Sequence, residues 1–106
     1  MPLNLAQLLA QIKQNNPKAD TTLVELAYEY AAQAHAGQTR RSGEPYIQHP
    51  LRTALTLAQI RAENDVVIAG LLHDVPEDTG RPLAEIDAEL KGVTDRILTM
   101  INGLTA

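Results

Sequence analysis

Two pairs of polar residues in the second half of the chain could take part in metal chemistry. His73 and Asp74 directly follow an apolar stretch, and Glu77 and Asp78 come one helical turn later. Because residues i and i+4 share a helix face, a continuing helix would place His73 beside Glu77 and Asp74 beside Asp78. Burying such groups without partners costs roughly 2–7 kcal/mol, and a bound cation would remove that cost. An isolated His-Asp pair also has a simpler explanation, a histidine favoured by the helix dipole and followed by solvated carboxylates.

His49 adds a second imidazole to this set. It stands where a helix is expected to begin, and one helix and a short loop separate it from His73. Together His49, His73 and Asp74 offer two nitrogen donors and one oxygen donor. This mixture suits Mn²⁺, Fe²⁺ or Zn²⁺ better than Mg²⁺ or Ca²⁺. A divalent transition metal held there would acidify a bound water, which Glu77 or Asp78 could position or deprotonate.

The loop before His49 carries residues that suit a phosphate group. Arg40, Arg41 and Ser42 lie in a polar, glycine-containing segment, residues 37–48. Guanidinium groups form forked hydrogen bonds with phosphate oxygens, so beside a metal these residues would clamp a phosphate. Taken alone, the same run fits a solvated loop equally well.

Apolar residues recur at helical spacing through most of the chain, and no stretch sustains the alternation of a strand. The spacing predicts an all-α bundle of about six helices over residues 3–14, about 20–36, 49 onward, 64–75, 82–90 and 92–102. Asp20 is expected to cap the second helix, and Pro50 to take the first helical position of the third. The fourth segment is apolar almost all round, so it should be the central helix. His35, at the end of the second predicted helix, is expected to be structural.

The composition argues against several classes of protein. The length fits a single domain over residues 1–106, and without cysteine there is no disulfide or thiolate metal site. A net charge of −4, from 13 acidic and 9 basic residues, argues against a general nucleic-acid-binding protein. No apolar run approaches the roughly 20 residues of a membrane span, and residues 1–12 lack the basic start of a signal peptide. We therefore expect a cytoplasmic protein that binds neither nucleic acid nor membranes.

Two segments of the chain resemble the hydrolase domain of the RelA/SpoT homologues. They are AHAGQTRRSGEPYIQHP, residues 34–50, and AGLLHDVPEDTG, residues 69–80. The resemblance extends over residues 20–105, and the family belongs to the HD-domain metal phosphohydrolases. It implies an HD-type helical bundle that removes the 3′-pyrophosphate from the guanosine alarmones ppGpp and pppGpp, usually with Mn²⁺.

The resemblance also implies three roles: metal ligation, water activation and nucleotide contact. The metal ligands would be His49, His73 and Asp74. The acidic pair that activates the attacking water would be Glu77 and Asp78. The loop that contacts the nucleotide would include Arg40, Arg41 and Ser42.

Two features depart from the pattern of that family. Pro76 stands where the family usually has an aliphatic residue, and it would bend the turn that carries Glu77. The family's fourth ligand is an aspartate on a later helix, and Asp95 falls too early to match it. The domain is therefore expected to be short at its C-terminus relative to the family. A homodimer could cover the apolar face that the missing helices would leave.

Three hypotheses of function follow. The first is a Mn²⁺-dependent guanosine 3′,5′-bis(diphosphate) 3′-pyrophosphohydrolase, which converts ppGpp or pppGpp to GDP or GTP plus pyrophosphate. The second is a catalytically impaired HD remnant that binds a metal, a nucleotide or a protein partner without turnover. The third is an HD-type hydrolase of a different nucleotide. The segment Glu77-Asp78-Thr79 beside three ligands favours the first, and the RRSGEPYIQHP match argues against the third.

Overall fold

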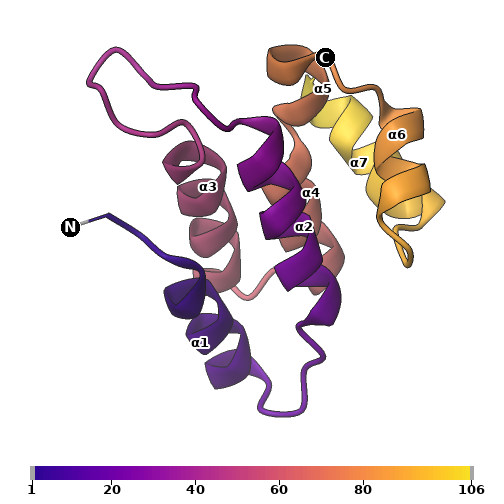
Figure 1. The fold of residues 1–106 in the computed structure, drawn as a ribbon. Helices are drawn as coiled ribbons and strands as arrows, with labels where there is room; N and C mark the ends of the chain where they lie inside the picture. The colour runs from indigo at the N-terminus through magenta and orange to yellow at the C-terminus, as the bar shows by residue number, and fades with distance from the viewer. Residues whose placement is uncertain (1, 106) are drawn as a thin grey trace.

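The computed structural model describes residues 2–105, and side chains as far as residue 103, as a bundle of helices (Figure 1). Within that part of the chain there is no named strand, and the seven helices are α1 (Leu5–Asn15), α2 (Thr22–Ala34), α3 (Gln48–Gln59), α4 (Asn64–Leu72), α5 (Val75–Thr79), α6 (Leu83–Glu89) and α7 (Asp95–Thr105). None of these seven is long and apolar enough to cross a membrane. The all-α class predicted from the sequence is confirmed. The fourth predicted helix ends three residues early, at Leu72, and the short helix α5 is an addition to the predicted set.

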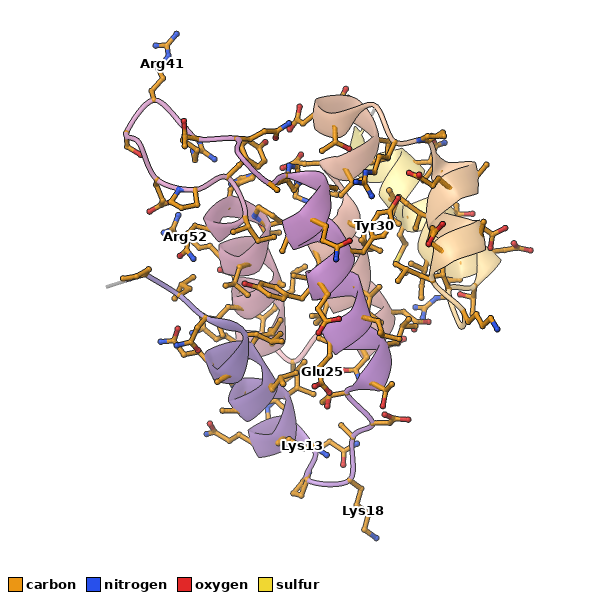
Figure 2. The ribbon with its side chains drawn as sticks, in the orientation of Figure 1. Lys13, Lys18, Glu25, Tyr30, Arg41 and Arg52 are labelled. Atoms are coloured by element: carbon orange, nitrogen blue, oxygen red, sulfur yellow. The ribbon has the colours of Figure 1, made fainter. Side chains whose placement is uncertain are left out.

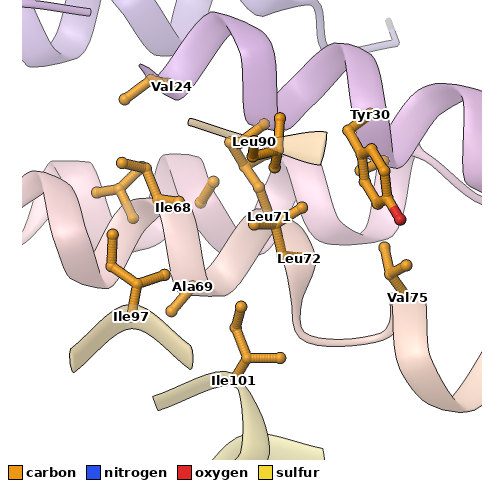
Figure 3. Close-up of a cluster of buried hydrophobic side chains, with 14 of the residues drawn as sticks. Val24, Tyr30, Ile68, Ala69, Leu71, Leu72, Val75, Leu90, Ile97 and Ile101 are labelled. Atoms are coloured by element: carbon orange, nitrogen blue, oxygen red, sulfur yellow. The ribbon is translucent and has the colours of Figure 1, made fainter. Parts of the chain in front are cut away.

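Helix α4 is the centre of the fold, as its apolar sequence predicts. It packs against α2, α3 and α7, and residues 67–72 are all buried. Ile97 and Ile101 of α7 are fully buried, and their side chains face α4 beside Ala69 (Figure 3). A helix covered on several faces has no solvated stripe, which explains why no polar face interrupts its sequence.

The segment before α1 is joined to α3 by one side chain. Gln48 is buried, its amide nitrogen donates to the Leu3 carbonyl at 2.9 Å, and its amide oxygen accepts from the Leu3 N–H at 2.7 Å. One residue later, the side chain of Asn4 caps α1 by accepting from the N–H of Gln7 at 3.0 Å. The start of α1 and the first turn of α3 are therefore fixed to one another.

The fourth predicted helix does not continue through its expected length. Predicted over residues 64–75, it ends as α4 at Leu72, and α5 begins after two further residues. Pro76 explains the division, because proline has no N–H to donate to the Leu72 carbonyl four residues earlier. The chain nevertheless stays close to helical, since the Asp78 N–H donates to the Asp74 carbonyl at 2.9 Å. Asp74 and Asp78 therefore keep the i, i+4 relationship of a helix.

The starts of the second and third helices also differ from prediction. Helix α2 begins at Thr22, and its N-cap is Thr21 instead of the predicted Asp20. The Asp20 carboxylate accepts from the Thr22 N–H at 2.9 Å in a turn that precedes the helix. Helix α3 begins at Gln48, two residues before Pro50. Proline fits anywhere in a first turn, because the N–H groups there have no helical partner.

The last helix begins later than its predicted start at Gly92. Gly92 has a φ of +99°, in the left-handed region, so the helix cannot include it. The Thr94 hydroxyl accepts from the N–H of Ile97 at 3.3 Å, as an N-cap does, and α7 starts at Asp95.

Candidate metal centre

The three predicted ligands meet at one end of the bundle. His49 lies in the first turn of α3, and His73 and Asp74 connect α4 to α5. Helices α3 and α4 pack side by side and run in opposite directions, so the start of α3 and the end of α4 lie together (Figure 1). One donor atom from each of the three residues lies within 4.8 Å of the others. Within the described part of the chain, no second group of three such donors comes together, and Asp95 is not part of this one.

Asp74 stands between the two imidazoles. Its Oδ1 lies 3.1 Å from Nε2 of His73, and its Oδ2 lies 3.2 Å from Nε2 of His49. The ring centroids of the two histidines are 5.8 Å apart. His73 and Asp74 are largely buried, whereas the His49 side chain is 35% exposed. Two imidazole nitrogens and one carboxylate thus converge from a partly open side, which fits a transition-metal ion that also binds water.

A hydrogen bond fixes the tautomer of His73. Its Nδ1 lies 2.6 Å from the carbonyl oxygen of Gly70, an acceptor, so the proton is on Nδ1. The lone pair of Nε2 is therefore directed at the space beside Asp74. Metal-binding histidines are typically oriented in this way by a carbonyl on the other ring nitrogen. The residues present thus fit a divalent transition metal.

The surroundings of His49 favour its neutral form. Burial lowers the pKa of His49 below its ordinary value of 6.5, while the Asp74 carboxylate raises it by a smaller amount. The positive charges of Arg40 and Arg52 add to the lowering. At neutral pH the imidazole of His49 is therefore uncharged, which is the form that binds metals.

The two predicted acidic residues, Glu77 and Asp78, differ in how firmly their carboxylates are held. The Tyr46 hydroxyl donates to Asp78 Oδ2 at 2.5 Å and also lies 3.2 Å from Asp74 Oδ2. Burial and the hydrogen bond to Asp78 raise the pKa of Tyr46 well above its usual range, so the hydroxyl keeps its proton and acts as the donor. Glu77 is exposed, and its carboxylate makes no hydrogen bond or ion pair with the described residues. Asp78 is therefore fixed and Glu77 is free to move.

The arginine loop lies beside this site. A cavity of about 410 Å³ is lined by Arg40, Arg41, Ser42 and Tyr46. The guanidinium carbon of Arg40 lies 5.9 Å from the centre of the Tyr46 ring, at the border of the site. Arg41 is at the tip of the loop and points away from the bundle (Figure 2). The structure thus brings Arg40 close to the predicted ligands and leaves Arg41 in solvent.

His35 lies beside Tyr46 and is not part of the cluster of candidate metal ligands. It is 2% exposed, and its ring stacks on Tyr46 with centroids 4.6 Å apart. Its Nδ1 lies 3.0 Å from Oε1 of Gln38. These contacts agree with a structural histidine.

Sequence reasoning missed Tyr46 as a site residue. In the sequence it indicates no more than a loop residue that needs a packing partner. Its position three residues before His49 was the available signal, because a side chain so near a ligand at a helix start lies close to the same site.

Comparisons with known proteins identify the family of the chain. The HD-domain family matches residues 27–106. The guanosine-3′,5′-bis(diphosphate) 3′-pyrophosphohydrolase of Spiroplasma citri is 48% identical over 101 residues, which are 93% of this chain and 13% of that protein. The probable GTP pyrophosphokinase of Mycobacterium leprae is 42% identical over 101 residues, 95% of this chain and 12% of that protein.

A third relative carries both activities in its name. The bifunctional (p)ppGpp synthase/hydrolase RelA of Mycobacterium tuberculosis is 47% identical over 76 residues, 72% of this chain and 10% of that protein. The chain therefore spans between 10% and 13% of the length of these three relatives. They are (p)ppGpp synthase and hydrolase proteins of the RelA/SpoT family, and this chain, matched over most of its length, belongs to the HD-domain family.

Proposed function

We propose that this chain is a metal-dependent hydrolase of the guanosine alarmones ppGpp and pppGpp. It would remove pyrophosphate from the ribose 3′ position and leave GDP or GTP. The observation that carries the proposal is the convergence of His49, His73 and Asp74 within 4.8 Å, next to an acidic pair. The choice of substrate is supported by relatives from Spiroplasma citri and Aquifex aeolicus that are named as 3′-pyrophosphohydrolases of guanosine 3′,5′-bis(diphosphate).

In this proposal His49, His73 and Asp74 hold Mn²⁺ or another divalent transition metal. When bound, the ion supplies Lewis-acid activation of water and of phosphate oxygens. Because Nδ1 of His73 is hydrogen-bonded to the Gly70 carbonyl, Nε2 is the nitrogen that would bind the ion. Three protein ligands would leave room for water and substrate on the ion, as in catalytic metal sites.

The acidic pair handles the proton of the attacking water. The water loses a proton to the carboxylate of Glu77 or Asp78. Its oxygen forms a bond to the phosphorus that carries O3′, and the P–O3′ bond breaks with its electron pair on O3′. A proton taken up by O3′ completes the ribose hydroxyl, and pyrophosphate leaves. Glu77, which is exposed, can pass its proton to solvent, whereas Asp78 keeps a fixed direction through Tyr46.

The arginine loop binds the phosphates of the nucleotide. Arg40 places a positive charge beside the site, and Arg41 adds a second at the tip of the same loop, although the whole chain has a net charge of −4. Ser42 adds a hydroxyl donor to the same cavity. The negatively charged alarmone is thereby drawn to the one side of the bundle where the metal ligands are.

The test is Mn²⁺-dependent release of pyrophosphate from ppGpp by the purified chain. Release should need the metal and should vanish in His73→Ala. Tyr30→Phe should retain it, because the Tyr30 hydroxyl donates to Glu85 and is not part of the ligand cluster. Metal-independent release, or release that persists in His73→Ala, would contradict the proposal. GTP and ATP serve as control substrates, because preferential release from either would indicate a different nucleotide.

A second candidate is binding of metal or nucleotide without turnover. It is favoured by the ligand count, since three donors hold a metal with looser geometry than four, and loose geometry is costly for catalysis. Mn²⁺ binding that depends on His73, with no pyrophosphate release, would select this candidate. For either function we propose a cytoplasmic location, based on the cysteine-free composition. The homodimer expected from the sequence stays a prediction.

A further inference from the structure

One loop holds Asp78 at two points. The loop is residues 35–47, between α2 and α3. The Gln38 amide donates to the Asp78 carbonyl at 2.9 Å, and the Tyr46 hydroxyl donates to Asp78 Oδ2 at 2.5 Å. The two anchors are joined, because the Tyr46 N–H donates to the Gln38 carbonyl at 2.9 Å. The backbone and the carboxylate of Asp78 are thus fixed by the same segment.

His35 supports both anchors from the buried side. Its ring lies nearly parallel to the Tyr46 ring, at an angle of 26°. Its Nδ1 lies 3.0 Å from Oε1 of Gln38, and since the amide nitrogen of Gln38 is engaged with Asp78, Nδ1 must be the donor. The other ring nitrogen, Nε2, is buried and has no partner among the described residues. An unprotonated Nε2 avoids a buried N–H without an acceptor, so His35 is held as the Nδ1–H tautomer.

Asp78 needs such support because of where it lies. It is exposed, near the end of the five-residue helix α5. An exposed aspartate otherwise samples several rotamers, and each points its carboxylate in a different direction. A short hydrogen bond from a hydroxyl to a carboxylate is among the stronger types, so it selects one of these directions.

We infer that Tyr46 is a positioning residue that sets the direction of the Asp78 carboxylate toward the attacking water, with His35 and Gln38 holding Tyr46 in place. The inference rests on the proposed hydrolase function. The Tyr46 hydroxyl also lies 3.2 Å from Asp74 Oδ2. One side chain therefore contacts both the Asp78 carboxylate and a proposed metal ligand.

The matched experiment compares Tyr46→Phe with Tyr30→Phe. Each variant removes one hydroxyl that donates to a carboxylate, since Tyr30 donates to Glu85 at 2.8 Å on the side of α6. Tyr46→Phe should lower kcat for ppGpp about 10- to 100-fold, the range expected for a lost hydrogen bond to a charged group. KM should change less than about threefold, because the ring remains. Kinetics are compared at saturating Mn²⁺, because the hydrogen bond from Tyr46 to Asp74 is lost as well and Mn²⁺ binding should weaken by about 10- to 100-fold. Tyr30→Phe should leave all three values unchanged.

An unchanged kcat in Tyr46→Phe would overturn the inference. So would a fall in kcat/KM that is due entirely to a higher KM. His35→Leu removes the aromatic ring that stacks on Tyr46 and the hydrogen bond to Gln38, so it should also lower kcat. Circular dichroism spectra of all three variants should match that of the wild type, so that a folding defect is recognised.

A second measurement separates this inference from the proposed function. In metal-free protein the Tyr46 hydroxyl proton should give a downfield, slowly exchanging NMR resonance, because it is held between Asp78 and Asp74. The resonance should be lost in Tyr46→Phe and altered in Asp78→Ala. If the wild type releases no pyrophosphate but shows this resonance, the hydrolase proposal fails, while the hydrogen bond from Tyr46 to Asp78 is confirmed. If the resonance is absent from the wild type, the positioning role fails whatever the activity.

Discussion

The Nδ1–H of His73 donates to the carbonyl of Gly70 at 2.6 Å, across the last turn of α4. Carbonyls in the last turn of a helix lack N–H partners, so the end of α4 provides an acceptor that an uninterrupted helix would not. The interruption before α5 and the orientation of His73 Nε2 toward Asp74 are therefore two aspects of the same local structure.

Removal of His73 should abolish specific metal binding. Changes in the outer partners of a metal ligand alone cost about 10- to 100-fold in affinity, so His73→Ala should weaken Mn²⁺ binding by more than that. Asp95→Asn is the matched control, because Asp95 is a carboxylate outside the cluster. Isothermal titration calorimetry checks both variants, and equal losses in the two would show that the cluster is not the binding site.

Acid should weaken both metal binding and the fold through His49. The pKa of His49 is lowered in the folded chain, so between that value and 6.5 the unfolded chain binds more protons. The contribution of neutral His49 to stability is therefore fully present above pH 6.5 and is lost as the pH falls. Urea unfolding at about pH 7.5 and about pH 5.5 should show a larger drop in the free energy of unfolding for the wild type than for His49→Gln. Equal drops would mean that another group governs the acid response.

The two arginines of the loop should differ in their effect on substrate binding. Arg40→Ala should raise KM for ppGpp about tenfold or more, because a lost hydrogen bond to a charged phosphate is worth that factor. Arg41→Ala should have a smaller effect, because Arg41 points into solvent at the loop tip (Figure 2). Steady-state kinetics at saturating Mn²⁺ would measure both variants. A larger rise in KM for Arg41→Ala would mean that Arg41, and not Arg40, is the main contact to the phosphates.

The central helix should dominate stability. Leu71 is fully buried, so Leu71→Ala should lower the free energy of unfolding by about 2–5 kcal/mol. Leu26 is 42% exposed, and Leu26→Ala should change it by no more than about 0.5 kcal/mol. Chemical denaturation of the two variants makes the comparison, and similar losses would contradict the central place of α4.

The sequence predicted the parts of the fold that depend on local pattern. The apolar run of α4 could be recognised as the core because no polar stripe interrupts it. Pro76 indicates an interruption after the central helix, and the structure has one. The exact end at Leu72 and the short helix α5 were not predicted, because proline can stop one helix and also fit the first turn of the next. Gly92 likewise marks the true boundary of α7, but its left-handed φ becomes evident only in the structure.

The candidate site was predicted as a set of residue types and not as a geometry. His49, His73 and Asp74 were selected by their donor chemistry, and the antiparallel packing of α3 and α4 brings them together. The hydrogen bonds of Tyr46 and the difference between Arg40 and Arg41 depend on the path of one irregular loop. Such a path is set by contacts between residues far apart in the sequence, which periodicity does not record.

The pairing of Gln48 with Leu3 restricts which residue can precede His49. The Gln48 amide gives one hydrogen to a carbonyl and takes one from an N–H, as a neighbouring peptide group would. A glutamate at this position could accept but not donate, and a lysine could donate but not accept. Either would leave the N–H or the carbonyl of Leu3, which is partly buried, without its partner. The first turn of α3, which carries His49, would then be held less firmly against the start of the chain.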